Sequence, residues 1–561
     1  MKRFVGFQSD RANLFALAAA WTAMALLVCP AGDFPVQDDW AYGLAVRSLV
    51  NDGVYRIPSF VSANLGPLVH WGALFCWPFG FSFTALRVST LVMGLFGIFG
   101  VYFLFREVWV DRRLALVAAV TLLVNPIYFA LANTFMTDVP FVALICAAMA
   151  LIVRGMRRED KLTLLGGLAL CLVAVLVRQF ALVIFGGFAC AWVAKRGMRT
   201  AAIIQASIPL AVGIAAHVAF NQWLLQTGRK ESFAGISDIT TASLGDFAYS
   251  SAHELLNVIV ELGWLLLPIA VLCFSRASRR PGPAGMRWPA LLAIVIGVAM
   301  SAFIVAERRT MPLTGDTLHY FGIGPLMLRD TLLIGWNLPP HDTTQTIFWI
   351  VMTGVAIIGA TLIVFALAKG CAESFDRSRT FNQSIRRAWP AIFFAATGLA
   401  YLGILLLIAT RHDLFDRYLL PLFIVVALAL PLLRVRTGKQ QSGGVAYAVV
   451  AIALFAFACF SVVATHDFLA WNRTRWIALS DLMQKSGVSP RQIDGGYEFN
   501  GWFLYDPRYE PHDEKSWWWV DDDEYRIAAG PTPGYRIVRR LAVDRWWDGT
   551  TPAVFVLRRD E

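Results

Sequence analysis

The sequence predicts a polytopic α-helical membrane protein that ends in a small α/β domain. Of its 561 residues, 57% are apolar and 16% are charged, whereas a soluble chain would have about a quarter of its residues charged. The apolar residues also come in runs of about 18–22, the length at which a helix crosses a hydrocarbon core of about 30 Å. Residues 466–561 lack such runs and contain many charged and turn-forming residues.

Run length predicts thirteen spans, which makes residues 1–465 the transmembrane domain. The expected spans are 13–31, 82–105, 114–131, 139–154, 162–177, 179–194, 200–220, 256–275, 288–306, 346–368, 388–409, 419–433 and 445–465. The fifth and sixth spans are short and form a hairpin that turns at Arg178 and Gln179.

Loop charge predicts the orientation, because cytoplasmic loops carry an excess of Lys and Arg. The loops on the N-terminal side hold 25 basic residues, and the loops on the other side hold ten. We therefore expect a cytoplasmic N-terminus and, after an odd number of spans, an external C-terminal domain. The net charge of +10 has the same origin, since residues 466–561 hold 13 basic and 16 acidic residues. This distribution argues against a nucleic-acid partner.

Residues 466–561 are expected to form an external α/β domain. A helix is predicted over WNRTRWIALSDLMQ, followed by strands around QIDGG, GWFLY, YRIAAG, GYRIVRRLAV and AVFVLRR. The first external loop predicts two short amphipathic helices, AYGLAVRSLV and VHWGALFCWPFG. Their Trp, Phe and His residues suit the boundary between water and lipid.

Three acids are the strongest candidates for chemistry. Asp38 and Asp39 follow the first span in FPVQDDWAYGLAV, and Asp138 opens the fourth span on the same side of the membrane. One interpretation is that they cap helices, since a carboxylate is favoured at a helix N-terminus. The other is functional, because acids at the mouth of a membrane bundle commonly mark a site. Their shared side favours a catalytic site at the external face.

Basic residues are expected on the same face. Arg178 and Gln179 turn the tight hairpin, and the segment RHDLFDRYLLP supplies Arg411 and Arg417 beside Tyr418. Arginine is suited to bidentate contacts with phosphate. The alternative is that these arginines reach lipid headgroups or pair with nearby acids.

Acids that accept a proton, beside arginines that hold an anion, predict a group-transfer reaction. A carboxylate would take the proton of an acceptor hydroxyl as that hydroxyl attacks, and burial or a second acid would raise its pKa. Nucleotide sugars and ATP are not available outside the membrane. The activated group is therefore expected to arrive attached to a lipid phosphate.

These features resemble the GT-C glycosyltransferases. More narrowly, the chain is similar to the bacterial family 39 type, relatives of protein O-mannosyltransferases and lipid A aminoarabinose transferases. The resemblance rests on the acidic pair in a D-[DE]-x-x-Y setting, the Asp that opens the fourth span, the [DE]RY-L-L-P segment, the thirteen spans and the external tail. It covers residues 10–435. It implies a polyprenyl-phosphate sugar donor, inversion at the anomeric carbon, no obligatory nucleotide and the bacterial inner membrane as location.

The resemblance also implies roles for individual residues. Asp38 would be the catalytic base and Asp39 its acidic neighbour. Asp138 would help to position the acceptor or the base, and Tyr42 would line the same site.

Arg417 and Tyr418 would lie near the donor, but the chain departs from the family pattern where the donor phosphate is held. Many relatives have a basic residue just before the first-loop proline, whereas this chain has Gly66 before Pro67. The later loops are one possible replacement. In the first loop the candidates are Arg47, Arg56 and His70.

No metal centre is predicted, because the histidines show no ligand spacing. The acidic run VDDDE (520–524) is expected to be a surface loop, where binding of a divalent cation stays possible. The acceptor is expected to be lipopolysaccharide, another envelope glycan, a lipid or a protein. The alternative function is a lipid-carrier or proton-coupled transporter, since acids and arginines within a membrane also serve in relays. The lack of evident repeat halves argues against it.

Overall fold

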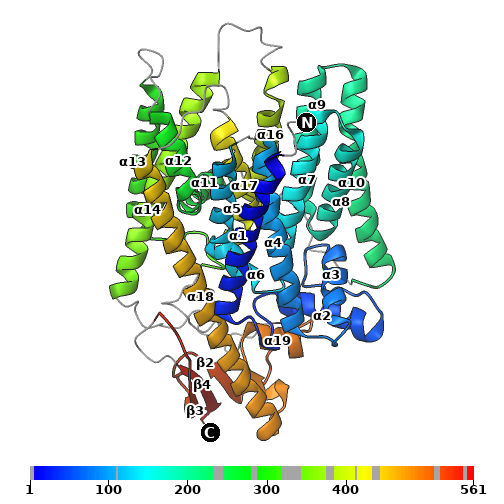
Figure 1. Ribbon diagram of the computed structural model, residues 1–561. Coiled ribbons are helices and arrows are strands. Elements are labelled where there is room, and N and C mark those ends of the chain that lie inside the picture. Colours follow the sequence, from blue (N-terminus) through cyan, green and yellow to red (C-terminus); the bar gives the residue numbers. More distant parts are fainter. Residues whose placement is uncertain are drawn as a thin grey trace.

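The computed structural model describes residues 5–108, 111–230, 244–278, 287–318, 323, 343–374, 385–410, 414–432, 443–510, 518–547 and 553–560. Within these ranges the helices form a bundle, and a small sheet domain covers one end of it (Figure 1). We call this end the tail face. Helix α1 (Val5–Val28) begins at the opposite end, so the two chain ends lie at opposite ends of the bundle.

A helix or a helix pair lies at each of the thirteen predicted spans. In the described ranges, eight helices are long and apolar enough to cross a membrane, or ten spans if each of two bent pairs is counted as one. Three further helices have only 17, 15 and 14 residues, namely α8 (Lys161–Val177), α9 (Leu182–Arg196) and α17 (Leu419–Leu432). These are shorter than the roughly 20 residues that a full crossing requires. The chain is a multi-pass membrane protein, and the count of thirteen is not confirmed.

The long helices other than α1 occupy the expected positions. They are α4 (Phe83–Val108), α7 (Asp138–Arg158), α10 (Thr200–Gln226), α13 (Trp288–Glu307), α14 (Thr343–Ser374), α16 (Trp389–Ile408) and α18 (Gly444–Lys485). The bent pairs are α5 (Arg112–Leu123) with α6 (Pro126–Ala132), at 59°, and α11 (Leu244–Leu265) with α12 (Leu267–Ser278), at 83°.

The first bend has a local cause. The Asn125 side chain accepts a hydrogen bond from the Tyr128 N–H and caps a new helix, and Pro126 has no N–H to donate to the preceding turn.

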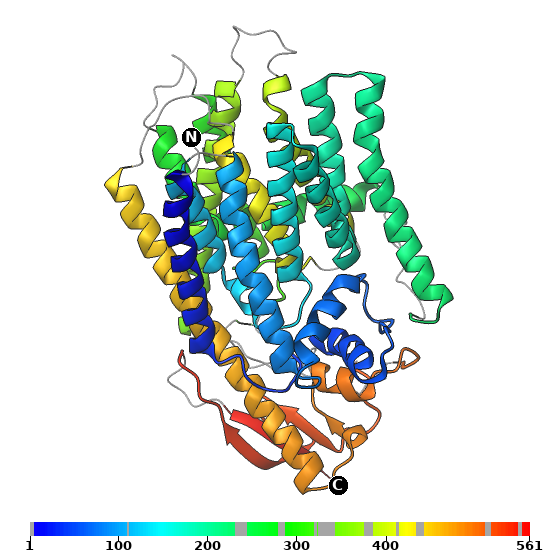
Figure 2. The same cartoon turned by 45° about the vertical axis from the view of Figure 1, so that its right-hand side comes forward.

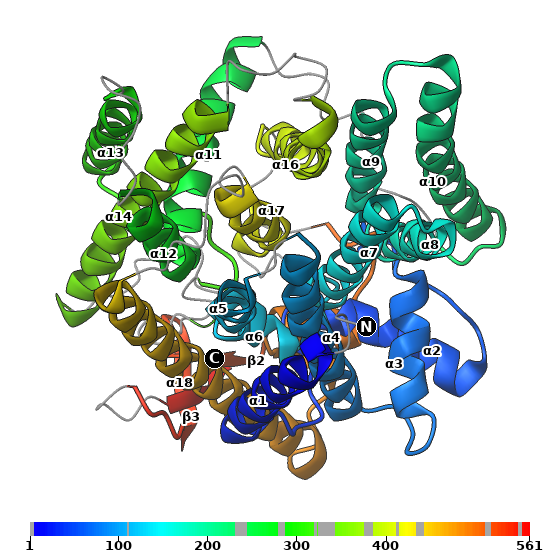
Figure 3. The ribbon, with the colours of Figure 1, turned by 45° about the horizontal axis from the view of Figure 1, so that its top comes forward.

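Helix α17 lies in the middle of the bundle, in contact with α4, α7, α11, α12, α14 and α16 (Figure 3). Its sequence, LLPLFIVVALALPL, is apolar on every side, which is typical of a helix that is buried all round. The short helix η4 (Asp416–Tyr418) leads directly into α17. The bundle centre therefore fixes the position of the polar residues in η4.

The two predicted amphipathic helices are confirmed as α2 (Asp39–Asp52) and α3 (Gly66–Cys76). They lie beside the tail-face end of α4, next to the C-terminal domain (Figure 2). Trp77 and Phe79, just after α3, are 74% and 90% exposed. Large exposed aromatic side chains at this position suit a boundary between water and lipid.

Helix α18 runs without a break from the last predicted span into the C-terminal domain. Beyond it, four strands form one sheet in the order β1-β2-β4-β3. They are β1 (Ile493–Asp494), β2 (Tyr525–Ala528), β3 (Tyr535–Ala542) and β4 (Ala553–Arg559). Strand β1 is parallel to β2, whereas β4 is antiparallel to both β2 and β3. These strands match four of the five predicted ones.

The strand predicted at GWFLY is wrong, because this segment lies in helix α19 (Tyr497–Leu504). Its aromatic residues favour a strand by propensity, but packing against α2 overrides that preference. Gly501 lies so close to the Trp40 ring that an added Cβ would be 2.6 Å from Cδ2 of that ring. The helix thereby brings the C-terminal domain against the loop that holds Asp38.

Candidate active site

Asp38 lies just before α2 and has a hydrogen-bond partner on each of its carboxylate oxygens. One carboxylate oxygen accepts a hydrogen bond from Arg417 Nη2 at 3.0 Å, and the other accepts one from the Tyr497 hydroxyl at 2.6 Å. Its side chain remains 23% exposed. A carboxylate has about four lone-pair positions, so Asp38 can still accept a proton while both partners hold it in place.

Asp39 has a different environment from its neighbour. It is fully buried, and its two oxygens accept hydrogen bonds from the backbone N–H groups of Val36 and Phe135. Burial raises the pKa of Asp39 to about 8, although Arg87 opposes the shift. This carboxyl joins the Asp38 loop to the segment between α6 and α7. The arrangement fits a positioning role for Asp39.

Arg417 connects Asp38 to another acid, Asp316, which was not predicted as a site residue from the sequence. Arg417 Nη1 lies 3.2 Å from Asp316 Oδ2, and the arginine side chain is only 7% exposed. Burial raises the pKa of Asp316 to about 7, with Arg417 opposing the shift and Asp416 and Asp38 adding to it. Burial alone would lower the pKa of Arg417, but Asp316 and Asp38 outweigh burial and raise it.

The loop that carries Asp316 is held by two buried acids. The backbone N–H groups of Leu313 and Thr314 donate to Glu261 of α11 at 2.8 and 2.6 Å. Those of Thr317 and Leu318 donate to Asp416 at 3.0 and 2.7 Å. Buried polar groups of this kind are costly to leave without a hydrogen-bond partner, so the four hydrogen bonds resist displacement of the loop. They fix the loop and with it the carboxylate of Asp316.

Asp138 and Arg178 form a third ion pair at the start of α7, where Asp138 is 2% exposed. The Arg178 guanidinium lies 5.0 Å from the Tyr418 ring centroid, and the Arg417 guanidinium lies 5.7 Å from the same ring. The Tyr418 ring is therefore in contact with both guanidinium groups. We call Asp38, Asp138, Asp316, Arg178 and Arg417 the charged cluster.

Tyr42 of α2 lies within the electrostatic field of the charged cluster. Burial and the charge of Asp38 raise its pKa, and the charges of Arg417, Arg178 and Asp138 also act on its hydroxyl. The cluster thus draws side chains from the first loop, from α7, from the α8–α9 hairpin, from the loop after α13 and from η4. The structure brings Asp38 and Asp138 together at one end of the bundle.

The C-terminal domain closes over this end. Besides the Tyr497 hydrogen bond to Asp38, Glu498 accepts from the Gln37 N–H at 3.1 Å and from Arg475 Nη2 at 2.6 Å. An aromatic layer covers Trp40, whose ring centroid lies 6.0 Å from that of Tyr497 and 5.2 Å from that of Trp519. The site is built jointly by the membrane domain and the C-terminal domain.

Not every predicted site residue joins the cluster. His70 is exposed, its Nδ1 pairs with the Gly66 carbonyl at 2.8 Å, and its ring stacks on Tyr55. Gln179 begins the short helix η1 (Gln179–Ala181) next to Arg178, which confirms the hairpin but gives Gln179 no contact with the acids in the described ranges. Arg411 lies outside the described residues.

Two residues of the site, Asp316 and Tyr497, were not predicted from the sequence. Asp316 lies in a long loop that holds no predicted element, and its only signal is that it is an acid on the same side as Asp38. Tyr497 lies at the start of α19, 459 residues from Asp38 along the chain. No local pattern connects residues so far apart.

The acids of VDDDE are engaged by arginines. Asp523 accepts from Arg526 Nη2 at 2.9 Å and from the Tyr535 hydroxyl at 2.6 Å. Glu524 pairs with Arg558 at 2.9 Å. Among the residues that the structure describes, no group of three or more His, Cys, Asp or Glu side chains is arranged to hold a metal ion.

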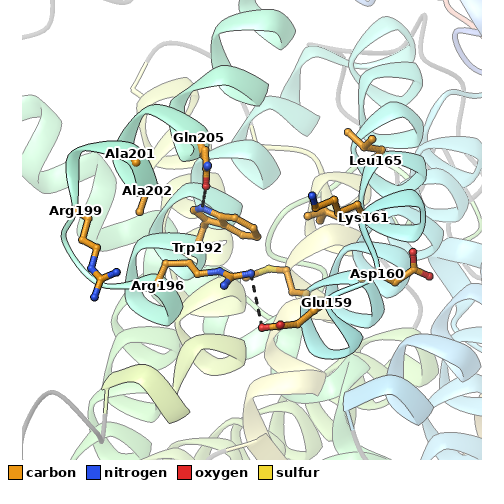
Figure 4. Close-up of a pocket in the computed structure, with 13 residues that line it drawn as sticks. Glu159, Asp160, Lys161, Leu165, Trp192, Arg196, Arg199, Ala201, Ala202 and Gln205 are labelled. Atoms are coloured by element: carbon orange, nitrogen blue, oxygen red, sulfur yellow. Dashed lines mark hydrogen bonds and ion pairs between the residues drawn. The ribbon is translucent and has the colours of Figure 1, made fainter.

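Two pockets of about 680 Å³ flank the bundle. One lies at the tail face between α2, the end of α10 and Tyr505, and we call it the basic pocket because Arg47, Arg56, Arg229 and Lys230 line it. The other lies at the opposite end, between the α7–α8 and α9–α10 turns (Figure 4). There Arg196 faces Glu159, and Trp192 donates to Gln205 at 3.3 Å. Cations and acids are mixed in this second pocket, and it contains no predicted site residue.

Residues 65–225 match the family model described as dolichyl-phosphate-mannose-protein mannosyltransferase. The matched segment contains Asp138, Arg178 and Gln179, and it covers less than half of the chain. Over this segment the match confirms the resemblance to protein mannosyltransferases that the short motifs predict. No curated protein sequence matches the chain.

Solved structures of two proteins also align with the chain. ArnT from Cupriavidus metallidurans bound to undecaprenyl phosphate is 12% identical over 98% of each chain, with a TM-score of 0.42. Its apo form is 12% identical over 97% of this chain and 98% of that one, also at 0.42. The apo oligosaccharyltransferase of Archaeoglobus fulgidus is 16% identical over 90% of this chain and 61% of that one, at 0.42.

Proposed function

We propose that the protein is an integral membrane glycosyltransferase. It would move a sugar from a polyprenyl-phosphate carrier to an acceptor hydroxyl, with inversion at the anomeric carbon. The observation that carries the proposal is the environment of Asp38, a partly exposed carboxylate held by Arg417 and Tyr497 at the mouth of a helix bundle. The family model that matches residues 65–225, named for a dolichyl-phosphate-mannose-dependent transfer, supports the same reaction class.

In the proposed reaction, Asp38 accepts the proton of the acceptor hydroxyl. The hydroxyl oxygen attacks the anomeric carbon, the bond between that carbon and the phosphate oxygen breaks, and the polyprenyl phosphate leaves with the electron pair. General-base catalysis of this kind contributes about 10²–10⁴ to the rate. Arg417 and Tyr497 keep the carboxylate oriented, and a well-oriented catalytic group removes much of the entropic part of the barrier.

The other residues of the charged cluster have supporting roles in this proposal. Asp138 and Arg178 orient the acceptor or the sugar, and Asp316 fixes the guanidinium of Arg417. Tyr42 and Tyr418 lie close to both arginines of the cluster, where they would contact the substrates. No obligatory cofactor is proposed for the reaction.

We further propose that the tail face lies outside the cytoplasm in a bacterial inner membrane. The excess of basic residues in the loops of the opposite end supports this orientation. The acceptor is then an envelope component with a free hydroxyl: lipopolysaccharide, another glycan, a lipid or a protein.

The test uses the purified full-length protein in proteoliposomes. It is given polyprenyl-phosphate sugars carrying labelled sugar, together with an envelope extract, and the products are separated by mass. Transfer of the label to an acceptor, with release of polyprenyl phosphate, is the expected result. Movement of the intact labelled carrier across the membrane without transfer would replace the proposal by the transporter hypothesis.

A further inference from the structure

The two neighbouring acids at the start of α2 contact different parts of the molecule. Asp38 remains partly exposed and binds Arg417 and Tyr497. Asp39 is fully buried and accepts hydrogen bonds from backbone N–H groups. Both sets of contacts depend on the direction in which the backbone enters α2. The residue that sets this direction therefore controls where the proposed base points.

That residue is Gln37, which lies just before the two acids in an unfavourable backbone conformation. Its φ is 56°, in the left-handed region. It is the first central residue of a turn in which the Asp39 N–H donates to the Val36 carbonyl at 3.4 Å. Turns with a positive φ at this position favour glycine, because a side chain there lies too close to the backbone. A glutamine keeps such a conformation only where the surrounding structure stabilises it.

One stabilising contact of Gln37 comes from the C-terminal domain. The Gln37 N–H donates to Glu498 Oε1 at 3.1 Å. Glu498 follows Tyr497 in α19, so two successive residues of this helix bind two successive residues of the loop before α2. The two bonds act on different groups. Tyr497 holds the carboxylate of Asp38, whereas Glu498 holds the backbone that leads into it.

Glu498 is itself fixed by a cation of α18. Its other oxygen, Oε2, accepts a hydrogen bond from Arg475 Nη2 at 2.6 Å, and the side chains of Glu498 and Arg475 are only 12% and 6% exposed. The Arg475 guanidinium lies 5.1 Å from the centroid of the Trp471 ring in the same helix. Separation of an ion pair with so little exposure would leave an uncompensated charge, which is strongly unfavourable. The Glu498 carboxylate is therefore a well-fixed acceptor for the Gln37 N–H.

We propose that Glu498 is a positioning residue, which stabilises the left-handed conformation of Gln37 and thereby aims Asp38 at the acceptor hydroxyl. This inference rests on the proposed function and adds a residue that acts on the base through the backbone. Without this hydrogen bond, Gln37 would relax to a more favourable φ, and the Asp38 carboxylate would leave its place between Arg417 and Tyr497.

The test measures transfer of labelled sugar by the full-length protein in proteoliposomes. Glu498→Met keeps the length of the side chain but has no oxygen to accept the hydrogen bond. We expect kcat to fall about ten- to a hundredfold, as the loss of a hydrogen bond to a charged group implies. KM should change little, because Glu498 acts on the base. Glu524→Met also removes a carboxylate of the C-terminal domain that pairs with an arginine, Arg558, and this control should keep full activity.

A second substitution separates positioning from general stability. Glycine adopts a positive φ without strain, so a protein with Gln37→Gly depends less on Glu498. We expect Gln37→Gly/Glu498→Met to be about fivefold or more faster than Glu498→Met, since glycine avoids the left-handed penalty. Glu159→Gly/Glu498→Met is the matched control. Glu159 also has a φ of 56°, but it lies in the pocket at the opposite end of the bundle, so glycine there should not restore kcat.

Two results would overturn the proposal. The first is full activity of Glu498→Met. The second is an equal rate for the two double variants, whether both or neither is faster than Glu498→Met, because the conformation of Gln37 would then have no specific effect on the rate.

Amide hydrogen exchange without substrate keeps this inference separate from the proposed function. Glu498→Met should speed exchange in peptides that contain Gln37, whereas Glu524→Met should leave it unchanged. If no carrier supports transfer but Glu498→Met still speeds this exchange, the proposed function fails while the hold of Glu498 on the loop is confirmed. Unchanged exchange in Glu498→Met would contradict the inference whatever the activity.

Discussion

Tyr497, in the C-terminal domain, donates a 2.6 Å hydrogen bond to Asp38, which lies just after the first membrane helix. The two residues are 459 positions apart. This bond makes the C-terminal domain part of the candidate active site, and removal of the Tyr497 hydroxyl tests whether the domain contributes to the chemistry.

The Tyr497→Phe variant removes the hydroxyl group and keeps the ring that packs on Trp40 and Trp518. We expect transfer to fall about ten- to a hundredfold, since one charge-assisted hydrogen bond to a carboxylate is worth about 1.5–3 kcal/mol, with little change in Tm. Initial rates with labelled carrier measure the effect. Tyr535→Phe loses an equivalent bond, to Asp523, and should keep full activity. A Tyr497→Phe protein as fast as the wild type would remove the C-terminal domain from the chemistry.

Gly501 allows α19 of the C-terminal domain to pack closely on Trp40 of α2. A Cβ there would overlap the Trp40 ring, so Gly501→Ala should push α19 away from α2 and displace Tyr497. We expect a loss of activity and faster cleavage by protease at the edge of the C-terminal domain. Gly530→Ala is the matched control, because its added Cβ meets nothing within 4 Å. If both variants behave like the wild type, the close contact between α19 and α2 does not support the site.

The pair of Arg178 with Asp138 requires arginine geometry as well as charge. Lysine in its place keeps the charge but loses the planar contact with Tyr418, 5.0 Å away. We expect Arg178→Lys to lower kcat/KM about tenfold, the effect of about 1.4 kcal/mol in transition-state binding. Arg196→Lys alters a similar arrangement with Glu159 and Trp192 at the other end of the bundle and should have no effect. Equal kinetics for the two variants would argue against a role for Arg178.

Asp316 predicts a specific pH dependence of stability. Burial raises its pKa to about 7 in the folded protein, from 3.8, so the folded state binds a proton that the unfolded state has released between about pH 4 and pH 7. This group therefore favours folding at the acidic end of that window, and its contribution is lost as the pH rises towards 7. Asp316→Asn should flatten the curve of Tm against pH in this window. Parallel curves for the wild type and the variant would contradict the raised pKa.

Much of the fold is predictable because bilayer thickness sets helix length. A helix or helix pair appears at every apolar run, yet the breaks at Asn125–Pro126 and between α11 and α12 show that a run does not specify a straight crossing. The C-terminal strands follow from β-branched and aromatic patterns. The helix that contains most of residues 501–505 (GWFLY) does not follow from these patterns, because it packs closely against Trp40.

The shared position of Asp38 and Asp138 at one end of the bundle was predictable, because each lies near the boundary of a predicted span. The environment of Asp39 could not be predicted from its place next to Asp38. Its carboxyl turns inward and accepts hydrogen bonds from two backbone N–H groups. Asp316 and Tyr497 could not be found from the sequence. Their positions depend on how Glu261 and Asp416 hold one loop and how α19 packs on α2, and these are properties of the assembled fold.

The most direct test of the account is the transfer rate of Asp38→Asn, measured with a carrier that the wild type uses. The variant keeps the size of the side chain and its place between Arg417 and Tyr497, but it cannot accept the proton. We expect the rate to fall by at least about a hundredfold, with Tm and carrier binding preserved. Transfer at the wild-type rate would show that Asp38 is not the base.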